Sequence, residues 1–383
     1  MPDTAPARGQ LANAAMSSPS PGNPTEPASD GSPDQPTARP YLGFGRRVVS
    51  ALSFRNISAL YLFALMFVVF ALWVPKTFLT SGTFRSLLAN QSITCLVAVG
   101  LVVPLASGVF DLAVGSEVGL GAIVSAWFLV RLGVPIPLAV LLTLAAGALI
   151  GVLVAFLIVR ARIISFIATL GVSSVLLALI SWISNQQQIL DVPAGFGTIA
   201  TGQLFGIVYP VYILLVVAVV LWYVLERTAI GRRVYATGGN PEAAGLAGVR
   251  TSRVILGATI TSGVIAGLAG LLITSQLSAG DPTIGPGYLL PAIAAAVLGS
   301  TQLRGGRYNV WGTVIAAYVL ATGVKGLQLA GAPVWIPELF NGAALLIAVG
   351  MAQLQRSPTA RTTAIRRLFR REQPASPPGS VPA

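Results

Sequence analysis

Two carboxylates stand close together in a chain that has very few charges in its apolar stretches. Asp111 and Glu117 lie in the run SGVFDLAVGSE, which covers residues 107–117. An ionisable side chain at membrane depth marks a functional site by default, because burying an unpaired charge there costs several kcal/mol. Asp111 can instead serve as the N-cap of a helix, since an apolar stretch follows it directly. The position favours the capping role, and a functional role stays open.

A second cluster of polar residues forms an island between two long apolar runs, RRVYATGGNPEAAGLAGVR at residues 232–250. Asn240 is a good N-cap, Pro241 suits the first helical position, and Glu242 lies where the helix dipole favours a carboxylate. Gly248 is a suitable stop. The stretch therefore predicts a short capped helix outside every membrane span. It can be a peg that enters the groove of a soluble partner, or a connector lying on lipid headgroups.

Several kinds of chemistry are excluded by residue type. The chain has no histidine and one cysteine, Cys95, so a zinc site, a Ser-His triad or a Cys-His dyad is effectively excluded. An intramolecular disulfide is impossible for the same reason. The sequence also lacks a G-x-x-x-x-G-K-[ST] phosphate-binding loop. We therefore expect this chain to bind no cofactor and not to hydrolyse ATP itself.

The elements that must position these residues are membrane helices. Hydrophobic residues make up 54% of the 383 and charged residues 9%, far below the roughly 25% of soluble domains. This composition predicts an all-α polytopic membrane protein with about ten transmembrane helices. The candidate spans lie near 59–75, 84–106, 112–130, 135–159, 163–183, 207–225, 254–275, 288–301, 309–329 and 337–354. The span 288–301 covers only about 21 Å at 1.5 Å per residue, which predicts a broken or tilted segment.

The basic residues predict the orientation of these spans. With a cytoplasmic N-terminus, 20 of the 24 lysines and arginines fall on the cytoplasmic side. This is the asymmetry that the positive-inside rule expects, so both termini and the island 232–250 are predicted to be cytoplasmic. The net charge of +12 is explained by these topology signals, and we expect no nucleic-acid partner.

The two ends of the chain differ from its centre. Residues 1–56 begin with a proline-rich stretch that has nine prolines in its first 40 positions, and they predict a disordered cytoplasmic tail. Residues 57–355 contain the predicted membrane spans, with the polar island inside a loop at 227–252. Residues 356–383 predict a basic disordered tail.

A family resemblance is carried by motifs that follow one another along the chain. These are SGVFDLAVGS (107–116), SFIATLG (165–171), GRRVYATGGNPEAAGLAGV (231–249), and LLPAIAAAVLGST with GGRYNVWGT (289–313). In this order they resemble the permeases of ribose-type monosaccharide ABC transporters, a binding-protein-dependent family. The third motif is similar to the family's cytoplasmic coupling loop, close to G-x-x-x-x-A-x-G-x-N-x-x-A-A-x-x-x-G-I. The chain departs from the family at Val109, Ala113, Ser165 and Leu289, which leaves the identity of the sugar open.

The resemblance implies a mechanism and a set of partners. It implies a permease of an ATP-driven importer of a monosaccharide or polyol, docked on ABC ATPase subunits and served by an extracytoplasmic sugar-binding protein. It also implies a permease homodimer or heterodimer in the lipid of a bacterial inner membrane. The implied ATPase-coupling residues are Gly238, Gly239, Asn240, Pro241, Glu242, Ala243, Ala244 and Gly248. The loops 184–206 and 277–287 are the expected contacts of the binding protein.

The substrate path is expected near polar and small residues of the apolar runs. Small residues let helices approach closely, so the same residues can form a packing seam. The residues expected in a translocation pathway or packing seam are Asn90, Gln91, Asp111, Gly115, Ser116, Glu117, Phe166 and Thr169. A secondary, ion-coupled transporter of a small polar solute is the alternative, since both halves contain a Gly-interrupted segment. It would need buried ion or proton ligands, of which the chain has very few.

Overall fold

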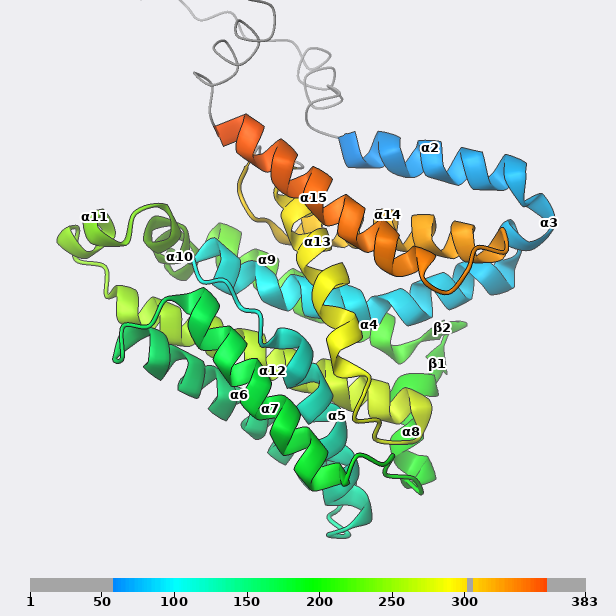
Figure 1. Ribbon diagram of the computed structural model, residues 1–383, viewed down its shortest axis with the longest axis horizontal. Helices are drawn as coiled ribbons and strands as arrows, with labels where there is room; N and C mark the ends of the chain where they lie inside the picture. Colours follow the sequence, from blue (N-terminus) through cyan, green and yellow to red (C-terminus); the bar gives the residue numbers. More distant parts are fainter. Residues whose placement is uncertain (1–57, 302–305, 357–383) are drawn as a thin grey trace, which may run out of the picture. The chain divides into compact units, whose positions relative to one another are not determined.

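The computed structural model describes residues 58–301 and 306–356. Helices dominate this part of the chain (Figure 1), as the composition predicted. The predicted tail 1–56 lies outside the described residues. So does the predicted tail 356–383, except for its first residue, Arg356, which ends α15. The disorder of both tails stays a prediction. The helices are α2 (Ser58–Trp73), α3 (Pro75–Phe78), α4 (Ser81–Ala106), α5 (Val114–Val130), α6 (Ile136–Val159), α7 (Ser165–Ser184), α8 (Ala194–Thr201), α9 (Tyr209–Arg227), α10 (Ala229–Gly239), α11 (Pro241–Leu246), α12 (Thr251–Leu277), the 3₁₀ helix η1 (Gly285–Tyr288), α13 (Leu289–Ser300), α14 (Val310–Leu329) and α15 (Ile336–Arg356).

Each predicted span is occupied by a helix. Among the described residues, six helices are long and apolar enough to cross a membrane, namely α4, α6, α7, α9, α12 and α14. Shorter apolar helical segments cover 63–73, 114–130, 285–300 and 336–350. The short predicted span 288–301 is occupied by α13, and η1 directly precedes it at the Gly-Pro-Gly stretch 285–287. The all-α polytopic class is confirmed, and the count of ten crossings stays a prediction.

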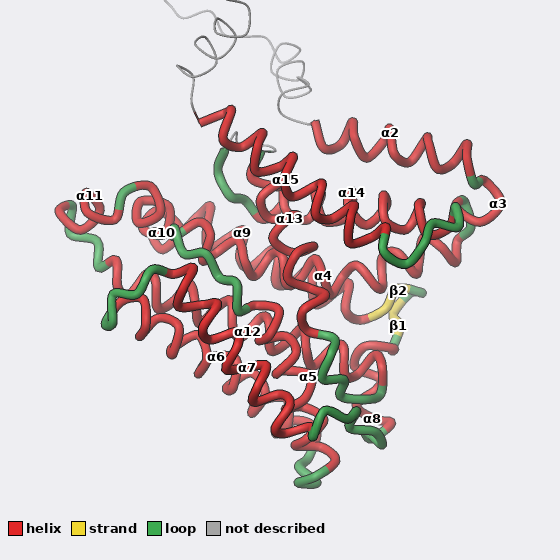
Figure 2. Tube along the Cα trace, viewed as in Figure 1, coloured by secondary structure: helices red, strands yellow, loops and turns green. Residues whose placement is uncertain are grey.

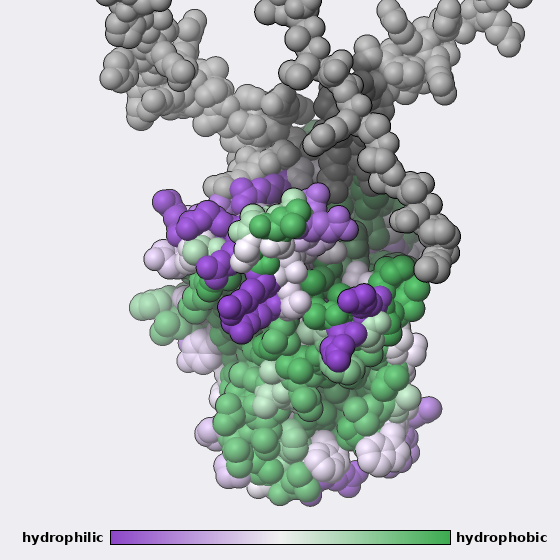
Figure 3. All heavy atoms as spheres, turned by 90° about the vertical axis from the view of Figure 1, so that its left-hand side faces the viewer, coloured by the Kyte–Doolittle hydropathy of each residue, from purple (hydrophilic) through white to green (hydrophobic). Residues whose placement is uncertain are grey.

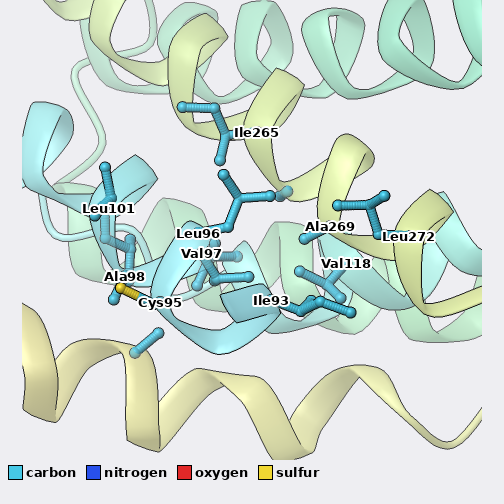
Figure 4. Close-up of a cluster of buried hydrophobic side chains, with 14 of the residues drawn as sticks. Ile93, Cys95, Leu96, Val97, Ala98, Leu101, Val118, Ile265, Ala269 and Leu272 are labelled. Atoms are coloured by element: carbon cyan, nitrogen blue, oxygen red, sulfur yellow. The ribbon is translucent and has the colours of Figure 1, made fainter. Parts of the chain in front are cut away.

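The core forms where α4 and α12 pack together and against α5. Figure 4 shows Ile93, Leu96 and Val118 facing Ile265 and Leu272, which are all buried. Cys95 lies in the same cluster with a fully buried thiol.

Glycines allow the closest of these helix contacts. A Cβ at Gly121 of α5 would lie 2.9 Å from the Cα of Gly267 in α12. A Cβ at Gly147 of α6 would overlap the carbonyl of Gly263, also in α12. Two backbones can approach this closely only where side chains are missing, which is the common device of helix packing in membranes. Helix α12 is thereby held between α5 and α6.

The segment 184–206, predicted as a long loop, contains more structure than expected. It holds α8, whose Phe196 and Ala200 are buried, and the Ala200 amide donates to the Ser275 hydroxyl of α12 at 2.9 Å. The segment then enters a hairpin of β1 (Gln203–Leu204) and β2 (Ile207–Val208), drawn yellow in Figure 2. Its turn residues, Phe205 and Gly206, both have positive φ, as two-residue hairpin turns require. The apolar side of α8 gains its stability from contact with α12, which local sequence does not reveal.

Candidate coupling helix and translocation site

The capped helix predicted at residues 240–248 is present as α11. The Asn240 carboxamide oxygen accepts a hydrogen bond from the Ala243 amide at 3.0 Å, and Pro241 occupies the first helical position. Gly248 follows with a φ of +83°, and the Val249 amide closes the end by donating to the Ala244 carbonyl at 2.9 Å. This αL glycine and its backward hydrogen bond are a common helix stop. Asn240, Pro241 and Gly248 therefore have the local roles that the sequence predicted.

The two faces of α11 differ sharply. The Ala244 side chain is buried within the chain, with 6% of its surface exposed. Glu242 and Ala243 are exposed, and Leu246 is 93% exposed. Successive residues of a helix are rotated by about 100°, so Leu246 points away from the face that carries Ala244. The sequence prediction named Ala244 as a docking residue, but the outward residue of largest apolar surface is Leu246, which it missed.

Gly238, the next-to-last residue of α10, lies against the end of α4. A Cβ at Gly238 would overlap the Ala106 carbonyl, and a Cβ at Gly108 would lie 3.4 Å from the Cα of Gly238. The neighbouring Gly239 is different, since a Cβ there would meet open space. Only Gly238 of this pair is therefore needed for a close backbone contact. This contact joins the end of α10 to the loop 107–113 that carries Asp111.

Asp111 holds that loop in place, although not as an N-cap. Its Oδ1 accepts from the Ala113 amide at 3.1 Å, and its Oδ2 accepts from the Ser262 hydroxyl of α12 at 2.7 Å. Helix α5 begins at Val114 with Ala113 as N-cap and without a side-chain cap. The capping role predicted for Asp111 is thus wrong, because its hydrogen bond closes a local turn before the helix. The buried carboxylate instead connects this turn to α12.

The first turns of α5 lie in a packed seam. Glu117 is 2% exposed, and its Oε2 is buried without a hydrogen-bond partner among the described residues. The Ser116 hydroxyl lies 2.6 Å from the Ser173 hydroxyl of α7. A Cβ at Gly115 would lie 3.1 Å from both the Gly285 carbonyl oxygen of η1 and the Leu289 Cβ. The start of α5 is therefore packed against α7 at Ser116 and against η1 and α13 at Gly115.

The start of α7 fastens the loop from its other side. The Thr169 hydroxyl donates to the Phe110 carbonyl at 3.2 Å, and the Phe110 amide donates to the Ser165 hydroxyl at 3.3 Å. Thr169 is fully buried, whereas the Phe166 side chain is 53% exposed, and only the Phe166 carbonyl contacts the Thr169 hydroxyl, at 3.3 Å. Ser165 stands where the resemblance expected proline, and it supplies one of the two hydrogen bonds.

The predicted residues Asn90 and Gln91 lie in a different place, where they line a cavity of about 210 Å³. The Asn90 carboxamide oxygen accepts a hydrogen bond from the side-chain amide Nε2 of Gln276 at 3.0 Å. Amides and hydroxyls dominate the polar part of the wall, and they both donate and accept hydrogen bonds. The polar lining residues are Ser86, Asn90, Gln91 and Thr94 of α4, Lys325 and Gln328 of α14, and Asn341 of α15.

Sequence reasoning missed the members of this wall that lie on α14 and α15. The signal that could have found them is the spacing of polar residues within apolar helices. Ser86, Asn90 and Thr94 are four residues apart and therefore share one face of α4. Lys325 and Gln328 are three apart and share a face of α14.

The two loops expected to contact a binding protein meet in the structure. Ile189 and Gly280 exchange two backbone hydrogen bonds of 2.9 Å. The side-chain amide Nε2 of Gln188 donates to Asp281 Oδ2 at 3.0 Å. Partial burial acts to raise the pKa of Asp281. Hydrogen bonds from the Thr283 amide and hydroxyl and from Gln188 outweigh this, so the pKa lies below its ordinary value.

Comparison with known proteins agrees with this architecture. Residues 83–349 match the family model described as branched-chain amino acid transport system / permease component. The chain is 35% identical to the ribose import permease protein RbsC of Bacillus subtilis, over 75% of this chain and 89% of that protein. It is 32% identical to the L-arabinose ABC transporter permease protein AraH of Azospirillum brasilense, over 77% and 86% of the two chains. It is 28% identical to the D-allose transport system permease protein AlsC of Escherichia coli, over 82% of this chain and 99% of that protein.

No solved structure matches the chain. The family match covers more than half of the sequence and includes the motifs at 107–116, 165–171, 231–249 and 289–313. Its helical architecture is that of a multi-pass membrane protein. The chain belongs to the family of ABC transporter permease components that includes the ribose, arabinose and allose permeases.

Proposed function

We propose that this chain is the membrane permease of an ATP-driven importer for a monosaccharide or polyol in a bacterial inner membrane. The observation that carries this proposal is the match of 72% of the chain to ribose import permeases at 32% identity, together with the matching motifs. Family membership supports the ATP-driven mechanism and not the ion-coupled alternative. The direction of transport, import, follows from the relatives.

The proposed topology has ten crossings with both termini in the cytoplasm. The asymmetry of lysines and arginines supports it. This orientation assigns α10 and α11 to the cytoplasmic side. It assigns the β1–β2 hairpin and the paired loops at Ile189 and Gly280 to the opposite side.

In this orientation α11 is the helix that couples ATP hydrolysis to transport. Leu246 projects from a short, capped and otherwise small-residue helix, which suits insertion into the groove of an ATPase subunit. Movement of α11 would reach α4 through the contact of Gly238 with Ala106. From there it would reach the loop that Asp111 fastens to α12. ATP and Mg²⁺ would be bound by the partner, and the permease would work as a homodimer or heterodimer.

The cavity beside Asn90 is the proposed entry site for the substrate. It lies in the halves of α4 and α14 that this topology places toward the outside. Its amides and hydroxyls can exchange hydrogen bonds with a polyhydroxylated solute. Nearby, the hairpin tip carries Phe205, which is 93% exposed and is a suitable contact for a sugar-binding protein.

Uptake measurements test this function. A strain lacking the gene is complemented with the wild-type permease and given radiolabelled pentoses, hexoses and polyols. We expect gene-dependent uptake of at least one of them, abolished by depletion of cellular ATP. Gene-dependent uptake that persists without ATP and follows an ion gradient would contradict the proposal.

A further inference from the structure

A second, larger cavity lies between α9, α10 and α12, and the function proposed above does not use it. Its volume is about 710 Å³. The wall contains side chains from three helices, one residue of α4 and the link between α11 and α12. The lining residues are Val103, Leu221, Val224, Leu225, Ile230, Arg233, Val234, Gly248, Arg250, Arg253, Val254, Gly257, Ala258 and Thr261.

All the charged side chains in this wall are positive. Arg233, Arg250 and Arg253 line the cavity and are exposed, and no acidic side chain lines it. Within the described part of the chain, none of the three forms an ion pair. The N-terminus of α12 lies at the same place, with Arg250 as N-cap and without a side-chain hydrogen bond to its first turn. Three guanidinium groups beside the positive end of a 27-residue helix favour an anion with several acceptor oxygens.

The remainder of the wall is apolar. Leu221, Val224 and Leu225 contribute it from α9, and Val254 and Ala258 from α12. A Cβ at Gly257 would meet open space, so the α12 side of the cavity is not filled by the chain itself. Figure 3 looks at the end of the molecule that carries α10 and α11. It shows hydrophilic residues gathered above a broad hydrophobic surface.

The position of the arginines fixes the depth of the charged rim. Arg250 and Arg253 lie at the start of α12, which is long and apolar enough to span a membrane. The rim is therefore at the level of the lipid headgroups, and the apolar wall extends toward the acyl chains. A ligand that fits both parts must carry a phosphate at one end and hydrocarbon at the other.

We propose that this cavity binds an anionic phospholipid, with its phosphate on Arg233, Arg250 and Arg253 and an acyl chain along α9 and α12. Basic pockets between membrane helices are known to suit anionic headgroups in this way. The lipid would connect α10 to α12 on either side of α11. It would thereby hold the coupling segment against the membrane, a role separate from substrate and ATPase binding.

Native mass spectrometry of the purified permease in neutral detergent tests the proposal. The probes are phosphatidylglycerol, phosphatidylcholine and free glycerol phosphate. We expect wild-type protein to bind phosphatidylglycerol. We expect R233Q/R250Q/R253Q to bind it with an affinity about tenfold lower. The matched control is R160Q/R162Q/R232Q, which removes three exposed arginines that do not line the cavity and should bind like wild type.

A second variant tests the apolar wall without changing charge. Gly257→Leu fills the cavity from a position that has free space, and it should also lose phosphatidylglycerol while it stays monodisperse in detergent. Equal binding of phosphatidylcholine, or equal binding of free glycerol phosphate, would overturn the lipid assignment. So would full lipid binding by R233Q/R250Q/R253Q combined with loss of the copurifying ATPase, since the arginines would then belong to a protein interface.

Discussion

The Asp111 carboxylate accepts a 2.7 Å hydrogen bond from the Ser262 hydroxyl, and this contact joins the loop before α5 to the middle of α12. The same loop follows Ala106, whose carbonyl is in contact with Gly238 at the end of α10. The segment 106–111 therefore contacts both the end of α10 and helix α12. This arrangement gives the buried carboxylate a definite structural purpose.

Replacing Asp111 with alanine should lower stability. The Ser262 hydroxyl and the Ala113 amide would both lose their acceptor in a buried place. An unsatisfied buried donor costs about 1–3 kcal/mol, so we expect a clear decrease in the thermal midpoint of the detergent-solubilised protein. Ser262→Ala should cost less, because a carboxylate oxygen can keep its Ala113 partner. A thermal midpoint for Asp111→Ala equal to that of wild type would show that these hydrogen bonds contribute nothing.

Gly238 and Gly239 offer a matched pair for testing the contact with α4. Gly238→Ala places a methyl group against the Ala106 carbonyl, whereas Gly239→Ala places it in open space. Alanine is otherwise favoured over glycine in a helix by about 1 kcal/mol. We expect Gly238→Ala to reduce uptake strongly and Gly239→Ala to leave it unchanged. Similar uptake by the two variants would show that the close approach does not transmit coupling.

The sequence was sufficient for the helices at the predicted membrane spans and for α11, because both follow from local signals. Long apolar runs gave the spans, and Asn240, Pro241 and Gly248 gave a capped helix whose ends match the structure. Contacts between residues far apart in the chain could not be predicted from such local signals. The inward position of Ala244 depends on how α11 folds back beside its neighbours, and so does the outward position of Leu246.

Asp111 shows the same limit at the site. Its spacing suited an N-cap, but the decisive partner is Ser262, which lies 151 residues away in sequence. The polar cavity was found only in part for a similar reason. Asn90 and Gln91 were predicted from α4 alone, whereas Lys325 and Asn341 come from helices that only tertiary packing brings beside them.

The junction of the loops 184–206 and 277–287 should weaken in acid. The pKa of Asp281 is lower in the folded state than in the unfolded state, so its carboxylate contributes stability above its unfolded pKa of about 3.9. That contribution is lost as the pH falls through the folded pKa. We expect Asp281→Asn to be less stable than wild type near neutral pH, with a difference that shrinks as the pH falls below the unfolded pKa. Thermal unfolding of wild type and Asp281→Asn, measured from neutral to acidic pH, gives this difference in stability. A difference that grows on acidification would contradict a stabilising role of these hydrogen bonds.

Two equally exposed positions test the proposed topology. Phe205 and Leu246 are each 93% exposed, and the native thiol of Cys95 is fully buried. An impermeant thiol reagent added to intact cells should label Phe205→Cys. It should label Leu246→Cys only after the membrane is opened. Labelling of Leu246→Cys in intact cells, with Phe205→Cys protected, would invert the orientation.

Docking of α11 on an ATPase would depend above all on the exposed side chain of Leu246, which makes Leu246 the position to vary. Ala244→Trp is unsuitable, because a large side chain there would overpack the permease itself. Instead, tagged wild type, Leu246→Met and Leu246→Glu are purified from mild detergent, and the copurifying protein that carries a phosphate-binding loop is quantified by mass spectrometry. We predict wild-type recovery of this ATPase with Leu246→Met, and about tenfold less with the folded, membrane-inserted Leu246→Glu. Recovery of the ATPase by Leu246→Glu at the wild-type yield would contradict the account.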